Sequence, residues 1–191
     1  DFPIKDFRER HDNITQAVGY NKGLMVLKML EFELSSNQGV LENPRHKWIE
    51  CAEKFYLKYQ FQKASFKDLF NMCSAVSGKD LNTFFHQWIE TIDVPEIKAT
   101  ILTAPELIPG NKNQGYQLKI KITQAIENSI HYLNLKLPYL VEFTDGEIFK
   151  SYFPLNKNQH DFTLQLYKKP KKLILDPEFE MVRILDLKEI P

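Results

Sequence analysis

The chain has 191 residues, 43% of them hydrophobic and 26% charged, which is the composition of a folded globular protein rather than a disordered one. Its 25 lysines and arginines match its 25 aspartates and glutamates, so the formal net charge is zero. Nucleic-acid-binding proteins usually carry a basic surplus or a basic stripe, so we expect no nucleic acid among the partners of this chain. The densest basic run, residues 168–172, is as typical of a solvated strand edge as of a nucleic-acid-binding patch. No apolar stretch approaches the roughly 20 residues that cross a bilayer, so we expect no transmembrane segment.

Residues 1–93 follow a helical period, and we predict four helices in them. The first covers residues 13–34 and is apolar on nearly every side from Leu24 onward, a pattern typical of a helix that is buried on several sides. The second begins at Asn43 and Pro44, an N-cap residue followed by proline at the first helical position. Its predicted apolar face is formed by Trp48, Ala52, Phe55, Tyr56 and Tyr59.

The two remaining helices carry their own start signals. Ser65 and Asp68 form a capping-box pattern that predicts the start of the third helix, and Gly78 predicts its end. Asp80 is the predicted N-cap of the fourth helix. Apolar residues recur at helical spacing in both: Phe66, Leu69, Phe70, Cys73 and Val76 in the third, and Leu81, Phe84, Phe85, Trp88, Ile89 and Ile92 in the fourth. Together, the four helices predict one bundle-like unit.

From residue 94 onward, apolar residues alternate with polar ones, which is the pattern of strands with one solvated face. The alternating residues are Leu118, Ile120 and Ile122; Leu133, Leu135 and Leu137; Phe162, Leu164 and Leu166; and Leu173 and Leu175. Asp145 and Gly146 lie between apolar runs and predict a hairpin turn. About six or seven such strands predict an antiparallel β-sandwich over residues 94–191. The predicted fold class is therefore α+β in two sequence-separated units, an N-terminal α-helical bundle followed by an antiparallel β-sandwich.

Sequence motifs for catalysis or metal binding are scarce. Cys51 and Cys73 belong to no metal-spaced pair, which favours two buried, reduced thiols. The five histidines form no His-Glu-x-x-His segment, and no two of them lie four apart on a helix. No Gly-x-Ser-x-Gly turn, glycine-rich phosphate loop or dinucleotide-binding motif occurs either. From the residues alone, we expect no self-sufficient active site, no bound metal and no cofactor in this chain.

One segment resembles a known family. Residues 19–23, Gly-Tyr-Asn-Lys-Gly, precede an apolar helical run, and together they resemble the Tyr-x-Lys-Gly segment of the aminopeptidase N-type zinc metallopeptidases, or gluzincins. Three further stretches resemble family segments in the same order: residues 7–18, 61–69 and 77–88. The resemblance covers nearly the whole chain. It implies that residues 1–93 are the helical C-terminal part of a catalytic domain and that residues 94–191 are the β-sandwich domain that follows it.

The resemblance also implies that the full-length parent protein is a peptidase, with zinc as its cofactor and peptides as its substrates. In the family, the motif tyrosine stabilises the tetrahedral intermediate, and this role carries over to Tyr20 alone. Lys22 and Gly23 are expected to have structural roles. Lys22 should have an exposed aliphatic stem, and Gly23 should lie where the backbone comes close to another group. The chain starts at Asp1 rather than at methionine, and the family's zinc ligands and catalytic glutamate would precede it, so we expect a fragment that is inactive alone.

Alternatives remain open at this point. The chain departs from the family pattern at Asn21, where glutamate is common, and at Asp93, where glycine is common. A non-catalytic scaffold or protein-interaction module of the same fold is the alternative to a peptidase, and a packing role at a helix start is the alternative for Tyr20. Residues 13–34 would expose apolar surface in the fragment, so we expect it to self-associate through this helix or to fray at its N-terminus.

Overall fold

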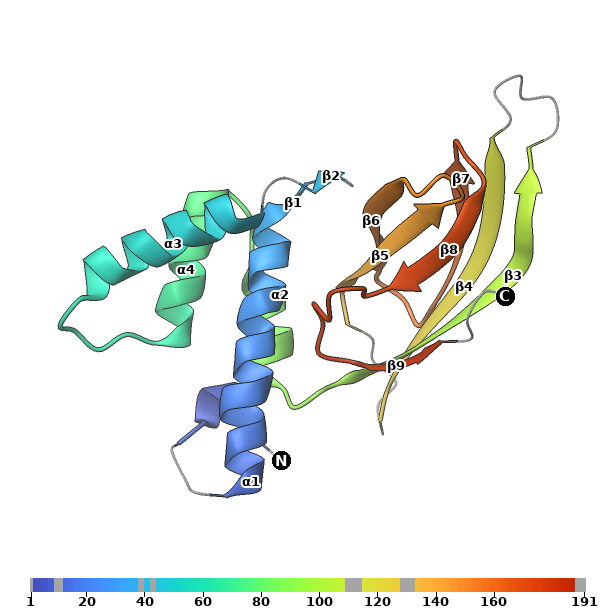
Figure 1. Cartoon of the computed structure of the whole chain (residues 1–191). Coiled ribbons are helices and arrows are strands. Elements are labelled where there is room, and N and C mark those ends of the chain that lie inside the picture. Colours follow the sequence, from blue (N-terminus) through green and yellow to red (C-terminus); the bar gives the residue numbers. More distant parts are fainter. Residues whose placement is uncertain are drawn as a thin grey trace. The chain divides into compact units, whose positions relative to one another are not determined.

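Two compact units make up the computed structural model, which describes residues 2–8, 12–37, 40–41, 44–108, 115–127 and 133–187 (Figure 1). The first unit consists of Asp1–Asp93 with Glu180–Val182, and the second of Val94–Phe179 with Arg183–Pro191. All helices lie in the first unit, and all strands longer than two residues lie in the second, as far as the described residues show. The mixed α+β class is therefore confirmed. None of the helices in the described part of the chain is long and apolar enough to cross a membrane.

The helical segments of the first unit follow the predicted order. They are η1 (Ile4–Asp6), α1 (Asn13–Thr15), η2 (Gln16–Lys22), α2 (Gly23–Ser35), α3 (Pro44–Tyr59), α4 (Phe66–Ser77), α5 (Asn82–Phe85) and η3 (His86–Glu90), with the short strands β1 (Ser36–Asn37) and β2 (Val40–Leu41) between α2 and α3. The predicted first helix is present, because α1, η2 and α2 follow one another without a break, and η2 is a π-helical segment within it. The predicted N-cap Asn43 lies outside the described residues.

The start of α4 is the predicted capping box. The Ser65 hydroxyl accepts a hydrogen bond from the Asp68 amide at 3.2 Å, and the Asp68 carboxylate accepts one from the Ser65 amide at 2.9 Å. Gly78 ends the helix with a φ of 72°, in the left-handed region that glycine tolerates. The fourth predicted helix begins later than expected, since α5 starts at Asn82. The Asp80 carboxylate accepts a hydrogen bond from the Asn82 amide at 2.9 Å. It therefore caps the helix from the residue before the N-cap position.

The buried face of α3 differs from the predicted one at one position. Cys51 is fully buried, whereas 65% of the Tyr56 surface is exposed. α3 packs against both α2 and α4. Successive residues of a helix are about 100° apart, so a face that includes Cys51 and Phe55 turns Tyr56 toward solvent. Placing Tyr56 on the buried face is wrong, because a broad apolar stripe does not show by itself which of its edges meets the neighbouring helices.

The first predicted helix buries much of its apolar surface. Its buried side chains include Val26, Met29, Leu30, Phe32 and Leu34. Three apolar side chains of the same stretch, Ile14, Tyr20 and Leu24, are more than half exposed. Self-association through residues 13–34 stays a prediction, and these three side chains are the ones available for it.

Both cysteines are fully buried, Cys51 on α3 and Cys73 on α4, in agreement with the prediction of two buried thiols. Burial raises the pKa of both thiols. Because the thiolate is the reactive form, we expect iodoacetamide to alkylate neither cysteine in the folded protein and both in urea. Mass spectrometry of the intact chain measures this. Fast alkylation without urea would contradict it and would show that the contact between α3 and α4 opens readily.

The second unit contains two sheets (Figure 1). Its strands are β3 (Pro95–Leu107), β4 (Tyr116–Ile126), β5 (Leu135–Phe143), β6 (Ile148–Leu155), β7 (Gln159–Leu166), β8 (Pro170–Leu175) and β9 (Ile184–Leu187). One sheet has the order β7-β4-β3-β9 and the other the order β6-β5-β8. All pairings are antiparallel except that of β9 with β3, which is parallel. The prediction of a purely antiparallel arrangement is wrong at this edge, because β9 is not joined to β3 by a hairpin and can therefore enter in either direction.

The alternating residues of the predicted strands form the core of the second unit. Leu118, Ile120 and Ile122 of β4 are almost completely buried. Phe153 of β6 and Phe162 of β7 bring the two sheets into contact, with ring centroids 4.7 Å apart. The inner faces of both sheets therefore contribute to one core.

Gln124 is a buried polar side chain near the end of β4. Its Nε2 donates hydrogen bonds to the carbonyl oxygens of Leu133 at 2.8 Å and Lys157 at 3.0 Å, and its Oε1 accepts one from the Leu133 amide at 3.1 Å. Leu133 precedes β5 of the three-stranded sheet, and Lys157 lies between β6 and β7. One amide side chain thus connects a strand of one sheet with backbone that leads into the other.

A buried ion pair lies between the end of β8 and the start of β9. Arg183 Nη2 is 2.7 Å from Asp176 Oδ2, and the Asp176 side chain is completely buried. The Asp176 amide also donates to the Pro138 carbonyl oxygen at 2.7 Å. The charges of both partners are therefore compensated inside the second unit.

The predicted hairpin at Asp145 and Gly146 joins β5 and β6, and Gly146 adopts a φ of 87°. Lys168 lies 2.6 Å from the Asp145 carboxylate and also pairs with Glu147. The basic run that begins at Lys168 leads into β8, an edge strand of its sheet, in agreement with the prediction of a solvated strand edge.

Candidate functional site

Tyr20 lies on η2, within the long helical stretch that starts at α1. The start of this stretch is fixed by Asp12, whose carboxylate accepts hydrogen bonds from the Thr15 amide and the Thr15 hydroxyl, each at 2.8 Å. Thr15 is itself buried. Tyr20 follows this cap by about two helical turns, so its side chain projects from a well-defined backbone.

The Tyr20 side chain is exposed over 54% of its surface and contacts one aromatic neighbour among the described residues. The Phe7 ring meets it edge to face, with centroids 5.6 Å apart and an interplanar angle of 77°. The Tyr20 hydroxyl has no hydrogen-bond partner among the described residues. The ring is therefore held from one side, while its hydroxyl stays available as a donor.

Gly19, rather than Gly23, is where the backbone comes close to another group. A Cβ atom at Gly19 would lie 1.8 Å from the nearest atom of the Phe7 ring. A Cβ atom at Gly23 would meet only the Val18 carbonyl oxygen, at 3.9 Å, and the Gly23 φ of −58° is that of an ordinary helix. The expected close approach at Gly23 is wrong. The missing side chain at Gly19 is what lets the Phe7 ring reach the position beside Tyr20.

We expect Gly19→Ala and Gly23→Ala to act in opposite directions. Gly23→Ala should raise the free energy of unfolding of the first unit by about 0.5–1 kcal/mol, because alanine loses less backbone entropy in a helix. Gly19→Ala should lower it by about 1–3 kcal/mol, because the new methyl group displaces the Phe7 ring. Tryptophan fluorescence in urea measures both, since Trp48 and Trp88 are the protein's two tryptophans and both lie in the first unit. Equal effects of the two substitutions would contradict this assignment.

Lys22 is anchored rather than a simple exposed stem. Its ammonium group donates to the Thr91 carbonyl oxygen at 3.3 Å, across 69 residues of sequence. Burial lowers the pKa of Lys22, and the nearby Asp93 carboxylate offsets part of that shift. Lys22 thus connects the Tyr20 segment with the residues that follow η3. Sequence reasoning missed this contact and the Phe7 contact, because neither partner of Tyr20 or Lys22 is marked by a local pattern.

Metal-binding side chains do not gather in the parts of the chain that the structure describes. No group of three or more His, Cys, Asp or Glu side chains that could hold a metal ion is present among those residues. A zinc site needs three or four such ligands. The described residues therefore do not fit a zinc ion by themselves.

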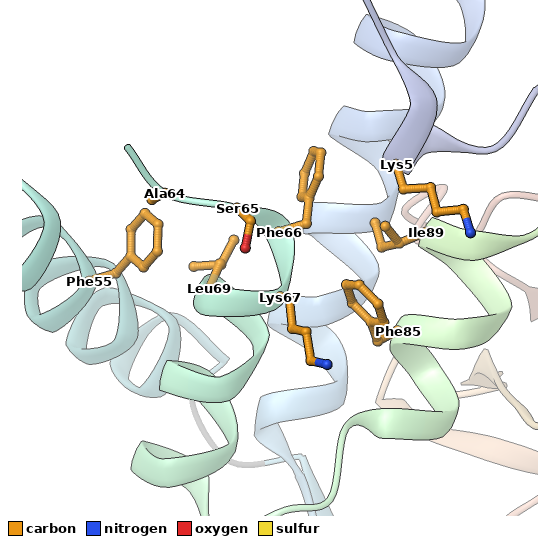
Figure 2. Close-up of a pocket in the computed structure, with 9 residues that line it drawn as sticks. All are labelled: Lys5, Phe55, Ala64, Ser65, Phe66, Lys67, Leu69, Phe85 and Ile89. Carbon is orange, nitrogen blue, oxygen red and sulfur yellow. The ribbon is translucent and has the colours of Figure 1, made fainter. Parts of the chain in front are cut away.

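A pocket of about 500 Å³ lies beside α4 in the first unit (Figure 2). It is lined by Lys5, Phe55, Ala64, Ser65, Phe66, Lys67, Leu69, Phe85 and Ile89. Phe55 comes from α3, Phe66 and Leu69 from α4, and the remaining apolar side chains from the turn before α4 and from α5 and η3. Tyr20 does not line this pocket.

Comparisons with known proteins identify the fold. No protein-family model matches the chain, and no curated protein matches it either. Among solved structures, the chain is similar to aminopeptidase A of Legionella pneumophila, whose crystal structure contains aspartic acid. The two chains share 18% sequence identity with a TM-score of 0.64, over 96% of this chain and 20% of the other. This chain thus spans about a fifth of the length of that enzyme. The likeness shows that the chain has an aminopeptidase-like fold.

Proposed function

We propose that this chain is part of an aminopeptidase N-type peptidase, in which residues 1–93 form the helical end of the catalytic domain and residues 94–191 form a β-sandwich domain. The observation that carries the proposal is the position of Tyr20. It belongs to the family-like Tyr-x-Lys-Gly segment, its ring is held by Phe7, and its hydroxyl is free of described partners. The aminopeptidase-like fold of the chain supports it.

In this proposal, Tyr20 is a hydrogen-bond donor to the substrate. When water adds to a peptide carbonyl group, negative charge grows on the carbonyl oxygen, and a donor already in place there lowers the barrier. A tyrosine hydroxyl suits the role, because it is an uncharged group that donates one hydrogen bond. The described residues do not fit a zinc ion by themselves, so the metal of the proposed parent would need ligands in addition to these residues.

The test is a pair of activity measurements. A longer protein that contains this chain should hydrolyse aminoacyl-p-nitroanilides, and a chelator should stop the reaction. The 191-residue chain alone should release no p-nitroaniline and should contain no stoichiometric zinc by elemental analysis. One tightly held zinc ion per chain would contradict the proposal for the chain alone. An intact protein without hydrolytic activity on any reporter would favour the non-catalytic scaffold instead.

A further inference from the structure

The pocket beside α4 changes in character from one end to the other (Figure 2). Phe55, Ala64 and Leu69 line one end, and Phe66 lies in the middle. Lys5, Phe85 and Ile89 line the other end. One end is therefore apolar, and the other combines apolar surface with charge.

No free polar group interrupts the apolar end. Ser65 is its only side chain with a hydroxyl group, and that hydroxyl donates to the Asp68 carboxylate at 2.7 Å as part of the α4 capping arrangement. A ligand with polar groups along its length would leave them without partners there, which is unfavourable. The apolar end therefore suits a hydrocarbon or aromatic body.

The charged side chains that line the pocket are both lysines, Lys5 and Lys67. The Glu90 carboxylate accepts a hydrogen bond from His86, with the two atoms 3.0 Å apart, and this contact and then the charges of Lys5 and Lys67 hold the pKa of Glu90 below its usual range. Lys5 and Lys67 both line the pocket, and their charges reach the nearby Glu90 carboxylate. Neither lysine forms an ion pair with another described residue. The two lysine ammonium groups thus have one carboxylate near them, that of Glu90, and this carboxylate already interacts with His86.

We propose that this pocket binds a small amphipathic carboxylate, with its apolar body against Phe55, Phe66 and Leu69 and its carboxylate near Lys5 and Lys67. The volume of about 500 Å³ suits a single small molecule, since ligand pockets usually measure about 300–1,000 Å³. The site is separate from Tyr20 and does not depend on the proposed peptidase activity.

Isothermal titration calorimetry of the 191-residue chain tests the proposal. The probe is decanoate, and decyltrimethylammonium, with the same alkyl chain and the opposite charge, is its matched control. Decanoate should bind and the cation should bind at least about tenfold more weakly, because it meets like charge. The double variant Lys5→Ala/Lys67→Ala should weaken decanoate binding about fivefold, since each exposed ion pair contributes modestly. Lys63→Ala, an exposed lysine outside the pocket, should leave it unchanged.

A second variant tests the apolar end independently of charge. Ala64→Trp places a large side chain at that end from an exposed position, so the fold should tolerate it and decanoate binding should be lost. Equal affinity for decanoate and decyltrimethylammonium would overturn the proposal. Equal decanoate affinities of the Lys5→Ala/Lys67→Ala and Lys63→Ala variants would also overturn the proposal. Decanoate binding that disappears as the protein self-associates would also overturn it, because a second copy would then be the occupant.

Discussion

Replacing Tyr20 with phenylalanine is expected to lower kcat of the full-length peptidase about 100- to 1,000-fold, because the loss of one oxyanion donor costs about 3 kcal/mol. The substitution removes the hydroxyl and keeps the aromatic ring, so the edge-to-face contact with Phe7 should persist. The lost interaction exists mainly in the transition state, since the carbonyl oxygen gains charge only as water adds. KM should therefore change little, and steady-state kinetics on an aminoacyl-p-nitroanilide separates the two constants.

Two controls distinguish this role from packing. Zinc content should be the same in both proteins, since the hydroxyl is not proposed as a ligand. Phe7→Leu removes the aromatic neighbour and leaves the Tyr20 hydroxyl in place, so it should lower kcat far less than Tyr20→Phe. If Tyr20→Phe kept more than roughly a third of the original kcat, Tyr20 would be a packing residue, because an oxyanion donor contributes far more than that.

Replacing Arg183 with methionine is expected to destabilise the second unit by about 3–5 kcal/mol. Methionine keeps much of the apolar length of the side chain and removes the cation 2.7 Å from Asp176. The Asp176 side chain is completely buried, so its carboxylate would lose the charge that compensates it. Both tryptophans lie in the first unit, so fluorescence does not report on this change. Amide hydrogen exchange of β5 and β8 as a function of urea does.

The matched control is an exposed ion pair of the same unit. Lys150 pairs with Glu178, and both side chains are about half exposed, so Lys150→Met should change the free energy of unfolding by less than about 1 kcal/mol. The double variant Asp176→Asn/Arg183→Met should recover part of the stability lost in Arg183→Met, because no buried charge remains uncompensated. A loss below about 1 kcal/mol in the single variant would mean that Asp176 is compensated by other groups.

The parts of the fold that local chemistry determines could be predicted from the sequence. The capping box of Ser65 and Asp68, the glycine that ends α4 and the Asp145-Gly146 hairpin each depend on a few neighbouring residues, and all three are present. Alternation of apolar and polar residues was sufficient to locate β4, because its partners on both sides are antiparallel and one of its faces is buried. The cap at Asp80 was misplaced by one residue, since a carboxylate can reach a helix start from either position.

Features that depend on distant segments could not be predicted. No pattern near Lys22 points to Thr91, and none near Asp176 indicates that its carboxylate is buried against Arg183. The parallel pairing of β9 with β3 has no local signal either, because it follows from where the chain returns after residues 180–182. For the candidate site, the family-like segment was sufficient to single out Tyr20. The Phe7 contact and the space that Gly19 leaves for it required the folded backbone.

We expect the Gln124 amide to couple the unfolding of the two sheets in the second unit. Its hydrogen bonds join β4 to backbone at one end of the β5–β6 pair, at Leu133 before β5 and at Lys157 after β6. If either sheet opened alone, buried hydrogen-bonding groups would lose their partners, at a cost of about 1–3 kcal/mol for each group. The free energy needed to open one sheet alone is therefore higher than the cost of losing its strand contacts. Such partial opening would add unpaired strand edges to those of the folded sheets, so its higher cost also disfavours association between strands of different molecules.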